Sequence, residues 1–208
     1  DPTQLLINQG ASGGYSFVNE FLERGLPFNE GDVDGAMVDF DNDGLLDLSV
    51  SRDTKYEGAY DPDSELDQQS WFGLMWQQPD GTFNSVGYQS GINDPDLQSD
   101  WEVMKGAQNH AWADIDHDGD LDLLVGGRDQ GGGRPNFLFR NDIGDQNRWL
   151  AVSLIGDGEN VTKDAFGARV TITFPKTGEL LVREKNSARG MYNSEDTRWL
   201  HFGLGESS

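Results

Sequence analysis

The sequence predicts an all-β protein whose turns carry Asp-rich loops. Its apolar runs are short, about four to eight residues each, and Gly, Asp, Asn or Pro bounds them. Helical periodicity is almost absent, and 27 glycines indicate many turns between short strands. Aromatic residues make up 11% of the chain and include six Trp, which argues against disorder for most of its length.

Nine apolar runs are expected to form strands: residues 4–8, 45–50, 71–77, 121–126, 136–141, 149–155, 168–174, 179–185 and 198–204. The alternation of Val170, Ile172 and Phe174 predicts a sheet with one buried face. The turn at 175–178 joins two such runs and predicts a hairpin. Residues 17–26 are the best candidate for a helix, and that helix would be short.

Two kinds of element alternate along the first part of the chain. Residues 36–50 (AMVDFDNDGLLDLSV) recur at 111–125 (AWADIDHDGDLDLLV), an offset of 75 residues. A second element, a short apolar strand followed by a polar turn that contains Gly, occurs at 5–17, 74–83 and 138–144. The repeat therefore predicts two structural units that are used more than once.

The composition changes near residue 145, after which the Asp-rich loops stop. We therefore expect a repeat region at 1–144, with two Asp-rich loops, and a small antiparallel β domain at 147–205. Residues 51–70 and 93–108 are acidic insertions that contain Pro and Ser, and they are expected to be surface loops.

The motif D-x-D-x-D-G-x-x-D occurs twice and is the strongest chemical signal. Calcium takes six to eight oxygen ligands, and carboxylates at positions 1, 3, 5 and 9 converge if the chain turns sharply at the Gly of position 6. The backbone carbonyl at position 7 can also face the ion. The predicted ligands of two Ca²⁺ ions are Asp39, Asp41, Asp43, Leu45 and Asp47 in the first loop, and Asp114, Asp116, Asp118, Asp120 and Asp122 in the second.

The alternative for each loop is an acidic turn in which Asp side chains cap the backbone and hold no ion. Two copies in matching strand contexts favour the metal. Ca²⁺ is favoured over Mg²⁺, because Mg²⁺ demands a tighter octahedron and keeps its waters. Three further acidic clusters lack the Gly and the following strand, so they are expected to be solvated charge: Asp32/Asp34, Asp61/Asp63/Asp67 and Asp94/Asp96/Asp100.

Charge and composition exclude several function classes. With 37 acidic and 15 basic residues the net charge is −22, which argues against nucleic-acid binding and against docking on an anionic membrane. No apolar run reaches the ~18–20 residues of a spanning helix, and no Cys is present for disulfides or thiol catalysis. His110, His117 and His201 lack zinc-binding spacing, and no nucleophile elbow occurs. We therefore expect no enzymatic activity.

These motifs carry a family resemblance. Residues 1–144 resemble the FG-GAP/VCBS repeats through VDFDNDGLLDLSV, ADIDHDGDLDLLV and PDGTF. Residues 147–205 resemble the ASPIC/UnbV domain through NRWLAVSLIG, FGARVTITF and HFGLG. Together they look like the C-terminal part of a cartilage acidic protein-like polypeptide. The resemblance implies calcium loops between the strands of β-propeller blades and an extracellular, calcium-dependent interaction module.

The resulting functional hypothesis is a secreted, non-catalytic, calcium-binding structural or adhesion module. Propellers have about four to eight blades and the repeats supply two, so open sheet edges favour self-association into an oligomer or filament. Two alternatives stay open: a module that binds carbohydrate or a cell-surface protein, which exposed Trp would favour, and the C-terminal fragment of a larger propeller protein. An enzyme fragment is a further alternative, because sequence cannot exclude a catalytic carboxylate pair.

Overall fold

The protein is described here from a computed structural model, which covers residues 3–26, 31–52, 71–87, 89–92, 107–127, 136–186 and 197–206. These residues form thirteen strands, one 3-10 turn and no α-helix, so the all-β prediction is confirmed. None of them belongs to a helix long and apolar enough to cross a membrane. Two groups of sequence features fall outside the described residues: most of the two expected surface loops, and the clusters Asp61/Asp63/Asp67 and Asp94/Asp96/Asp100.

The chain divides into two compact units that interleave in sequence. The first unit contains residues 1–37, 47–109 and 125–137, and the second contains 38–46, 110–124 and 138–208. Both Asp loops, apart from Asp47, therefore belong to the same unit as the C-terminal β strands. The expected boundary near residue 145 stays a prediction.

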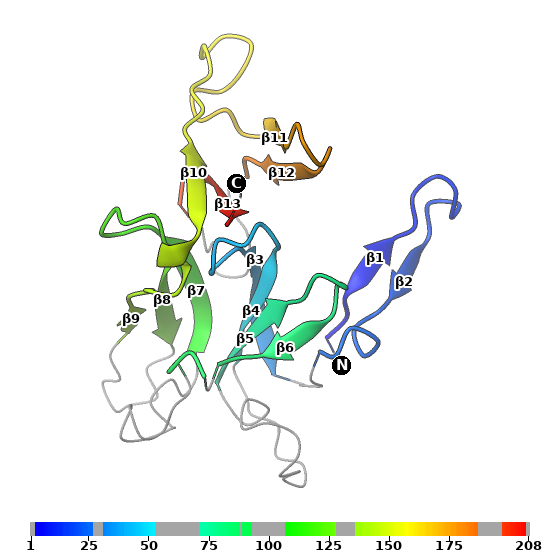
Figure 1. Cartoon of the computed structure of the whole chain (residues 1–208), viewed down its shortest axis with the longest axis vertical. Coiled ribbons are helices and arrows are strands. Elements are labelled where there is room, and N and C mark those ends of the chain that lie inside the picture. Colours follow the sequence, from blue (N-terminus) through cyan, green and yellow to red (C-terminus); the bar gives the residue numbers. More distant parts are fainter. Residues whose placement is uncertain are drawn as a thin grey trace, which may run out of the picture. The chain divides into compact units, whose positions relative to one another are not determined.

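A four-stranded sheet dominates the first unit (Figure 1). Its strands follow the chain order β3, β4, β5 and β6, with bounds Asp32–Val38, Asp47–Arg52, Phe72–Gln77 and Phe83–Ser85. The pairs β4–β5 and β5–β6 are antiparallel. Val50, Met75 and Phe83 of this sheet are buried together with Phe21 and Leu26, which come from the segment before it.

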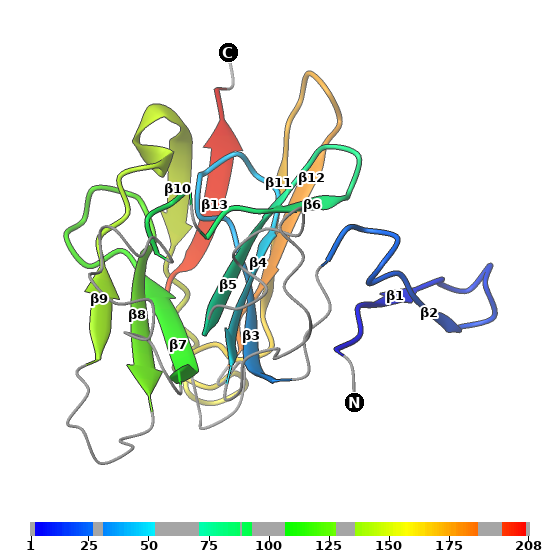
Figure 2. The same ribbon diagram turned by 90° about the horizontal axis from the view of Figure 1, so that it is seen from below.

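A separate hairpin of two strands precedes that sheet. Strand β1 (Leu6–Asn8) pairs with β2 (Phe17–Asn19) in an antiparallel register. It extends beyond the four-stranded sheet in both views (Figures 1 and 2). A three-stranded sheet contributes residues to both units and has the order β7 (Ala107–Ala113), β8 (Asp122–Gly127) and β9 (Phe137–Phe139).

The second unit contains two strand pairs around a small apolar core. Strand β10 (Arg148–Val152) pairs with β13 (Leu200–Gly205), and β11 (Arg169–Thr173) pairs with β12 (Leu180–Glu184). A 3-10 turn, η2, occupies Gly144–Gln146 before β10. The core consists of Leu181, Leu200 and Phe202, with partly buried side chains of β10 and β11 packed around them.

Each of the nine expected runs contains a strand, and the hairpin at 175–178 is confirmed. Phe174 N–H donates to the Glu179 carbonyl at 2.9 Å, and Gly178 has a φ of +75°. The alternation around Val170 and Ile172 is also confirmed, because these side chains are half-buried while their neighbours on β11 are exposed. Four strands were not predicted: β2, β3, β6 and β7.

The expected helix at 17–26 is wrong. Its first residues form β2, and a turn follows them. The Asn19 side chain accepts the N–H groups of Leu5 and Phe21, which ties this segment to β1 instead of to a helical turn. Gly25 then adopts a φ of +76°, a conformation that no right-handed helix accommodates.

Candidate metal centre

The two Asp loops share one backbone conformation. The residue at position 4 is left-handed in both, with a φ of +60° at Asn42 and +66° at His117. The glycine at position 6 is also positive, with a φ of +97° at Gly44 and +100° at Gly119. Because L side chains rarely adopt these angles, the motif needs its glycine for the turn that the sequence predicted.

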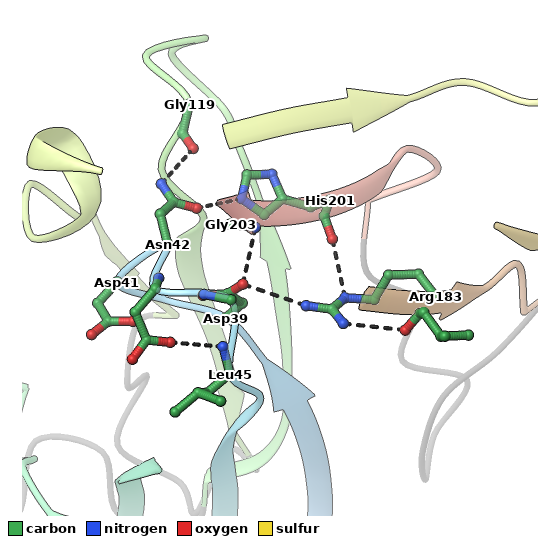
Figure 3. A network of polar contacts seen from close by, with 11 residues as sticks. Asp39, Asp41, Asn42, Leu45, Gly119, Arg183, His201 and Gly203 are labelled. Atoms are coloured by element: carbon green, nitrogen blue, oxygen red, sulfur yellow. Dashed lines mark hydrogen bonds and ion pairs between the residues drawn. The ribbon is translucent and has the colours of Figure 1, made fainter. Parts of the chain in front are cut away.

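In the first loop this turn gathers the carboxylates of positions 1, 3 and 5. One oxygen each from Asp39, Asp41 and Asp43 lies within 4.8 Å of the others. Asp39 is buried, and the other two are half-buried. Asp43 also accepts the Leu45 N–H at 2.7 Å, which holds the loop closed (Figure 3).

In the second loop the carboxylates of positions 1, 3 and 9 come together instead. One oxygen each from Asp114, Asp116 and Asp122 lies within 4.8 Å of the others. Asp122 fixes the loop by accepting the Ile115 N–H at 2.9 Å. Asp114 Oδ1 is buried without a hydrogen-bond partner, and an orphaned carboxylate oxygen beside two other acids is suited to a hard cation.

The remaining predicted ligands lie outside these two trios. Asp47 accepts the Gln77 N–H at 2.8 Å, and Asp118 accepts the Asp120 N–H at 3.0 Å. The backbone of Leu45 and of Asp120 makes matching contacts, because each N–H binds the carboxylate at position 5 of its own loop. The role of their carbonyls as ligands stays a prediction.

Burial makes several of these carboxylates unfavourable as anions. Burial raises the pKa of Asp39 to about 7, although Arg183 and two backbone N–H groups oppose the shift. Burial, together with the negative charges of Asp118 and Asp145, raises the pKa of Asp120 to about 6. Burial likewise raises the pKa of Asp43. A bound cation would oppose each of these shifts, because a nearby positive charge favours the ionised carboxylate.

The first loop packs directly against the C-terminal strands of its unit. Asp39 Oδ2 accepts the Gly203 N–H of β13 at 2.9 Å and lies 3.4 Å from the Arg183 guanidinium of β12 (Figure 3). Arg183 also donates from Nε to the His201 carbonyl at 3.2 Å and lies over the Phe202 ring, 5.3 Å from its centroid. One acid therefore holds two strands that are far from it in sequence.

Asn42 joins the first loop to the second loop and to β13. Its amide nitrogen donates to the Gly119 carbonyl at 3.1 Å and to Asp120 Oδ1 at 2.9 Å. Its amide oxygen lies 2.6 Å from His201 Nε2 (Figure 3). Burial, reinforced by Arg183, lowers the pKa of His201 to about 4, so the imidazole is neutral and its Nε2–H is the donor. Asn42 is fully buried.

Sequence reasoning did not identify Asn42, Arg183 or Gly203 as part of this site. The His201 ring is buried and stacks on Trp149, with centroids 6.2 Å apart. Asn at position 4 was a usable signal, because Asn tolerates a positive φ. Arg183 and Gly203 carried no such signal in the sequence, since their role depends on packing between segments that are distant in the chain.

The tryptophans divide between core and surface. Trp71 and Trp112 are buried, whereas Trp149 is 40% exposed and Trp199 is 50% exposed. Trp199 stacks on His117 of the second loop, with centroids 6.5 Å apart. His117 is exposed.

Comparison with known proteins supports the C-terminal part of the resemblance. Residues 156–208 match the family described as ASPIC and UnbV. This segment contains β11, β12 and β13, and thus Arg183, His201 and Gly203. A search of curated proteins found no match.

The contact between the first loop and β13 depends on Gly203. A Cβ at this residue would lie 2.4 Å from the Asn42 carbonyl carbon and 2.5 Å from Asp39 Oδ2. We expect Gly203→Ala to lower the free energy of unfolding by about 1–3 kcal/mol, measured by urea denaturation. Gly35→Ala is the control, since its Cβ finds only the Ser49 carbonyl at 3.8 Å. Equal midpoints for the two variants would contradict the close packing.

The raised pKa of Asp39 predicts a pH-dependent effect in chelated protein. An unfolded Asp ionises near pH 4, so between about pH 4 and 7 only the folded chain retains this proton, and its stability falls as pH rises. His201 has a lowered pKa and acts in the opposite direction. Asp39→Asn isolates the acid: we expect it to raise the Tm most at pH 7.5, less at pH 5 and least near pH 4. A Tm increment that is independent of pH would contradict the assignment.

Proposed function

We propose that this chain is a secreted, non-catalytic structural or adhesion module that binds one Ca²⁺ ion in each Asp loop and self-associates through strand edges. The observation that carries the proposal is the pair of carboxylate trios built on the same turn. The repeat architecture proposed for residues 1–144 is that of FG-GAP/VCBS propeller blades.

Calcium fits these loops better than other ions. The donors are carboxylate oxygens, without the imidazole or thiolate ligands that zinc prefers. Burial has already removed much of the water around the Asp39 carboxylate. The positive charge of a divalent ion bound there would compensate for that lost solvation. In the second loop, the unpaired oxygen of Asp114 is available for the same purpose.

A non-catalytic role agrees with where the perturbed acids lie. Among the described residues, every carboxyl group with a raised pKa belongs to an Asp loop. The acids of these loops hold backbone N–H groups and neighbouring strands, which are structural tasks.

Self-association is supported by sheets that are short of strands. Among the described strands, the hairpin β1–β2 has two and the sheet β7–β8–β9 has three, against four in the sheet β3–β6. Exposed strand edges carry unpaired N–H and C=O groups, which pair readily with another chain. Carbohydrate is a second candidate partner, favoured by the exposed faces of Trp149 and Trp199.

Calcium titration tests the metal sites. We expect isothermal titration of chelator-treated protein to find two sites, and Asp41→Asn or Asp116→Asn to remove one each, because Asn keeps the side-chain shape and loses the charge. Glu179→Gln, an equal loss of charge on an exposed turn of the second unit, is the control. Protein that binds no calcium after complete stripping would refute the proposal.

Light scattering tests the assembly. Two Ca²⁺ ions would add +4 and change the net charge from −22 to −18, which weakens repulsion between copies. In millimolar calcium, we expect the molar mass measured after size exclusion to increase with protein concentration. In chelator, we expect it to stay at the value of the monomer. A strictly monomeric protein in both conditions would remove self-association and leave the calcium sites unaffected.

A further inference from the structure

The hairpin β1–β2 repeats the hairpin β5–β6 position by position. Asn8 of β1 is opposite Phe17 of β2, and Gln77 of β5 is opposite Phe83 of β6. The sequences LLIN at 5–8 and LMWQ at 74–77 align in the same way. Sequence and strand register therefore identify β1 as the counterpart of β5.

Equivalent side chains are buried in the complete sheet and exposed in the hairpin. Met75 and Phe83 are 2% and 4% exposed. Their counterparts Leu6 and Phe17 are 52% and 59% exposed. The four-stranded sheet places β4 beside β5, whereas β2 is the only described strand that pairs with β1. The hairpin β1–β2 thus matches the β5–β6 half of the four-stranded sheet. No described strand takes the place beside β1 that β4 takes beside β5.

The backbone of β1 directs the Asn8 N–H away from β2. The Gln9 N–H donates to the Ser16 carbonyl at 2.9 Å, just as the Gln78 N–H donates to the Thr82 carbonyl at 2.8 Å. Because bonded and non-bonded residues alternate along an antiparallel pair, the N–H of Asn8 points to the edge away from β2.

In the two larger sheets, this outward N–H meets an Asp of fixed position. The Gln77 N–H donates to Asp47 Oδ1 at 2.8 Å, and the Asn141 N–H donates to Asp122 Oδ1 at 2.9 Å. Both acids are position 9 of an Asp loop and begin the strand that follows it. Asn141 is equivalent to Gln77 because LFRN at 138–141 aligns with LMWQ. The same contact therefore occurs twice, once in each unit.

We propose that the outer edge of β1 is a docking edge for a strand that closes an Asp loop, supplied by a polypeptide segment outside these 208 residues. The Asp at position 9 of that segment accepts the Asn8 N–H, and its strand pairs with β1 as β4 pairs with β5. In that register Leu6 takes the place of Met75, which lies opposite Leu48. The partner is therefore recognised by the pattern D-x-D-x-D-G-x-x-D-L.

This inference rests on the proposed pairing of open strand edges, but it assigns the β1 edge to a different polypeptide segment in place of a second copy, and it does not rest on the metal sites. The probe is a synthetic peptide with the sequence of residues 36–52, which contains one Asp loop and its strand. It is added to the ¹⁵N-labelled full chain in chelator, and amide shifts and hydrogen exchange are followed. We expect the Leu6 and Asn8 amides to shift and to become protected.

Matched variants localise the binding. Leu6→Pro removes an outward N–H and leaves the pairing of Ile7 with Val18 in place. Leu6→Lys places a charge on the same edge, and Tyr15→Lys is its control, because Tyr15 is 76% exposed in the hairpin turn and away from that edge. We expect either change at Leu6 to abolish protection and Tyr15→Lys to have no effect.

A second peptide tests the acid. Asp47→Ala in the peptide removes the acceptor for the Asn8 N–H, and we expect it to weaken binding about tenfold or more. No protection of β1 at millimolar peptide, or equal affinity for both peptides, would overturn the proposal. Protection of β1 that grows with protein concentration without peptide would also overturn it, because the occupant would then be a second copy. A normal calcium titration alongside a negative result would leave the proposed metal sites intact.

Discussion

The burial of Asp39 is the constraint on which the second unit depends. Moving a carboxylate out of water without compensation costs on the order of several kcal/mol. The compensation comes from the Gly44 and Gly203 N–H groups and from the Arg183 guanidinium, so the buried position of Asp39 depends on β12 and β13. The folding of the first Asp loop is therefore coupled to the folding of the C-terminal strands.

This dependence explains why sequence families and compact units do not coincide. The match to the ASPIC and UnbV family begins at residue 156, but β13 within it pairs with β10, which ends at Val152. The same unit takes in the first loop, more than a hundred residues earlier in the chain. A sequence signature marks where residue patterns recur, whereas a compact unit marks where side chains exclude water. Here the compact unit contains more residues than the matched segment.

Local sequence patterns were sufficient to predict most strands and the turn of the Asp loop. They failed where contacts between distant segments determine the structure. Short apolar runs located nine strands, and the glycine at position 6 has the positive φ that the motif requires. The strand β3 was missed because Asp32, Asp34 and Gly35 interrupt its apolar pattern, and buried neighbours override this weak propensity. The partners of Asp39 come from strands that no local pattern connects to it.

The residue at position 4 shows how far two copies of one motif can diverge on the same backbone. Asn42 and His117 share a left-handed conformation, but Asn42 is enclosed between two loops and a strand, whereas His117 lies on the surface against an indole. Exchanging the two nonapeptides would preserve the acids at positions 1, 3, 5 and 9, but it would place an imidazole where Asn42 makes its buried hydrogen bonds and would remove its partner Asp120 from the second loop. The loops are thus homologous in form but not interchangeable: the first has become an internal joint of the fold, and the second remains free to vary on its outer side.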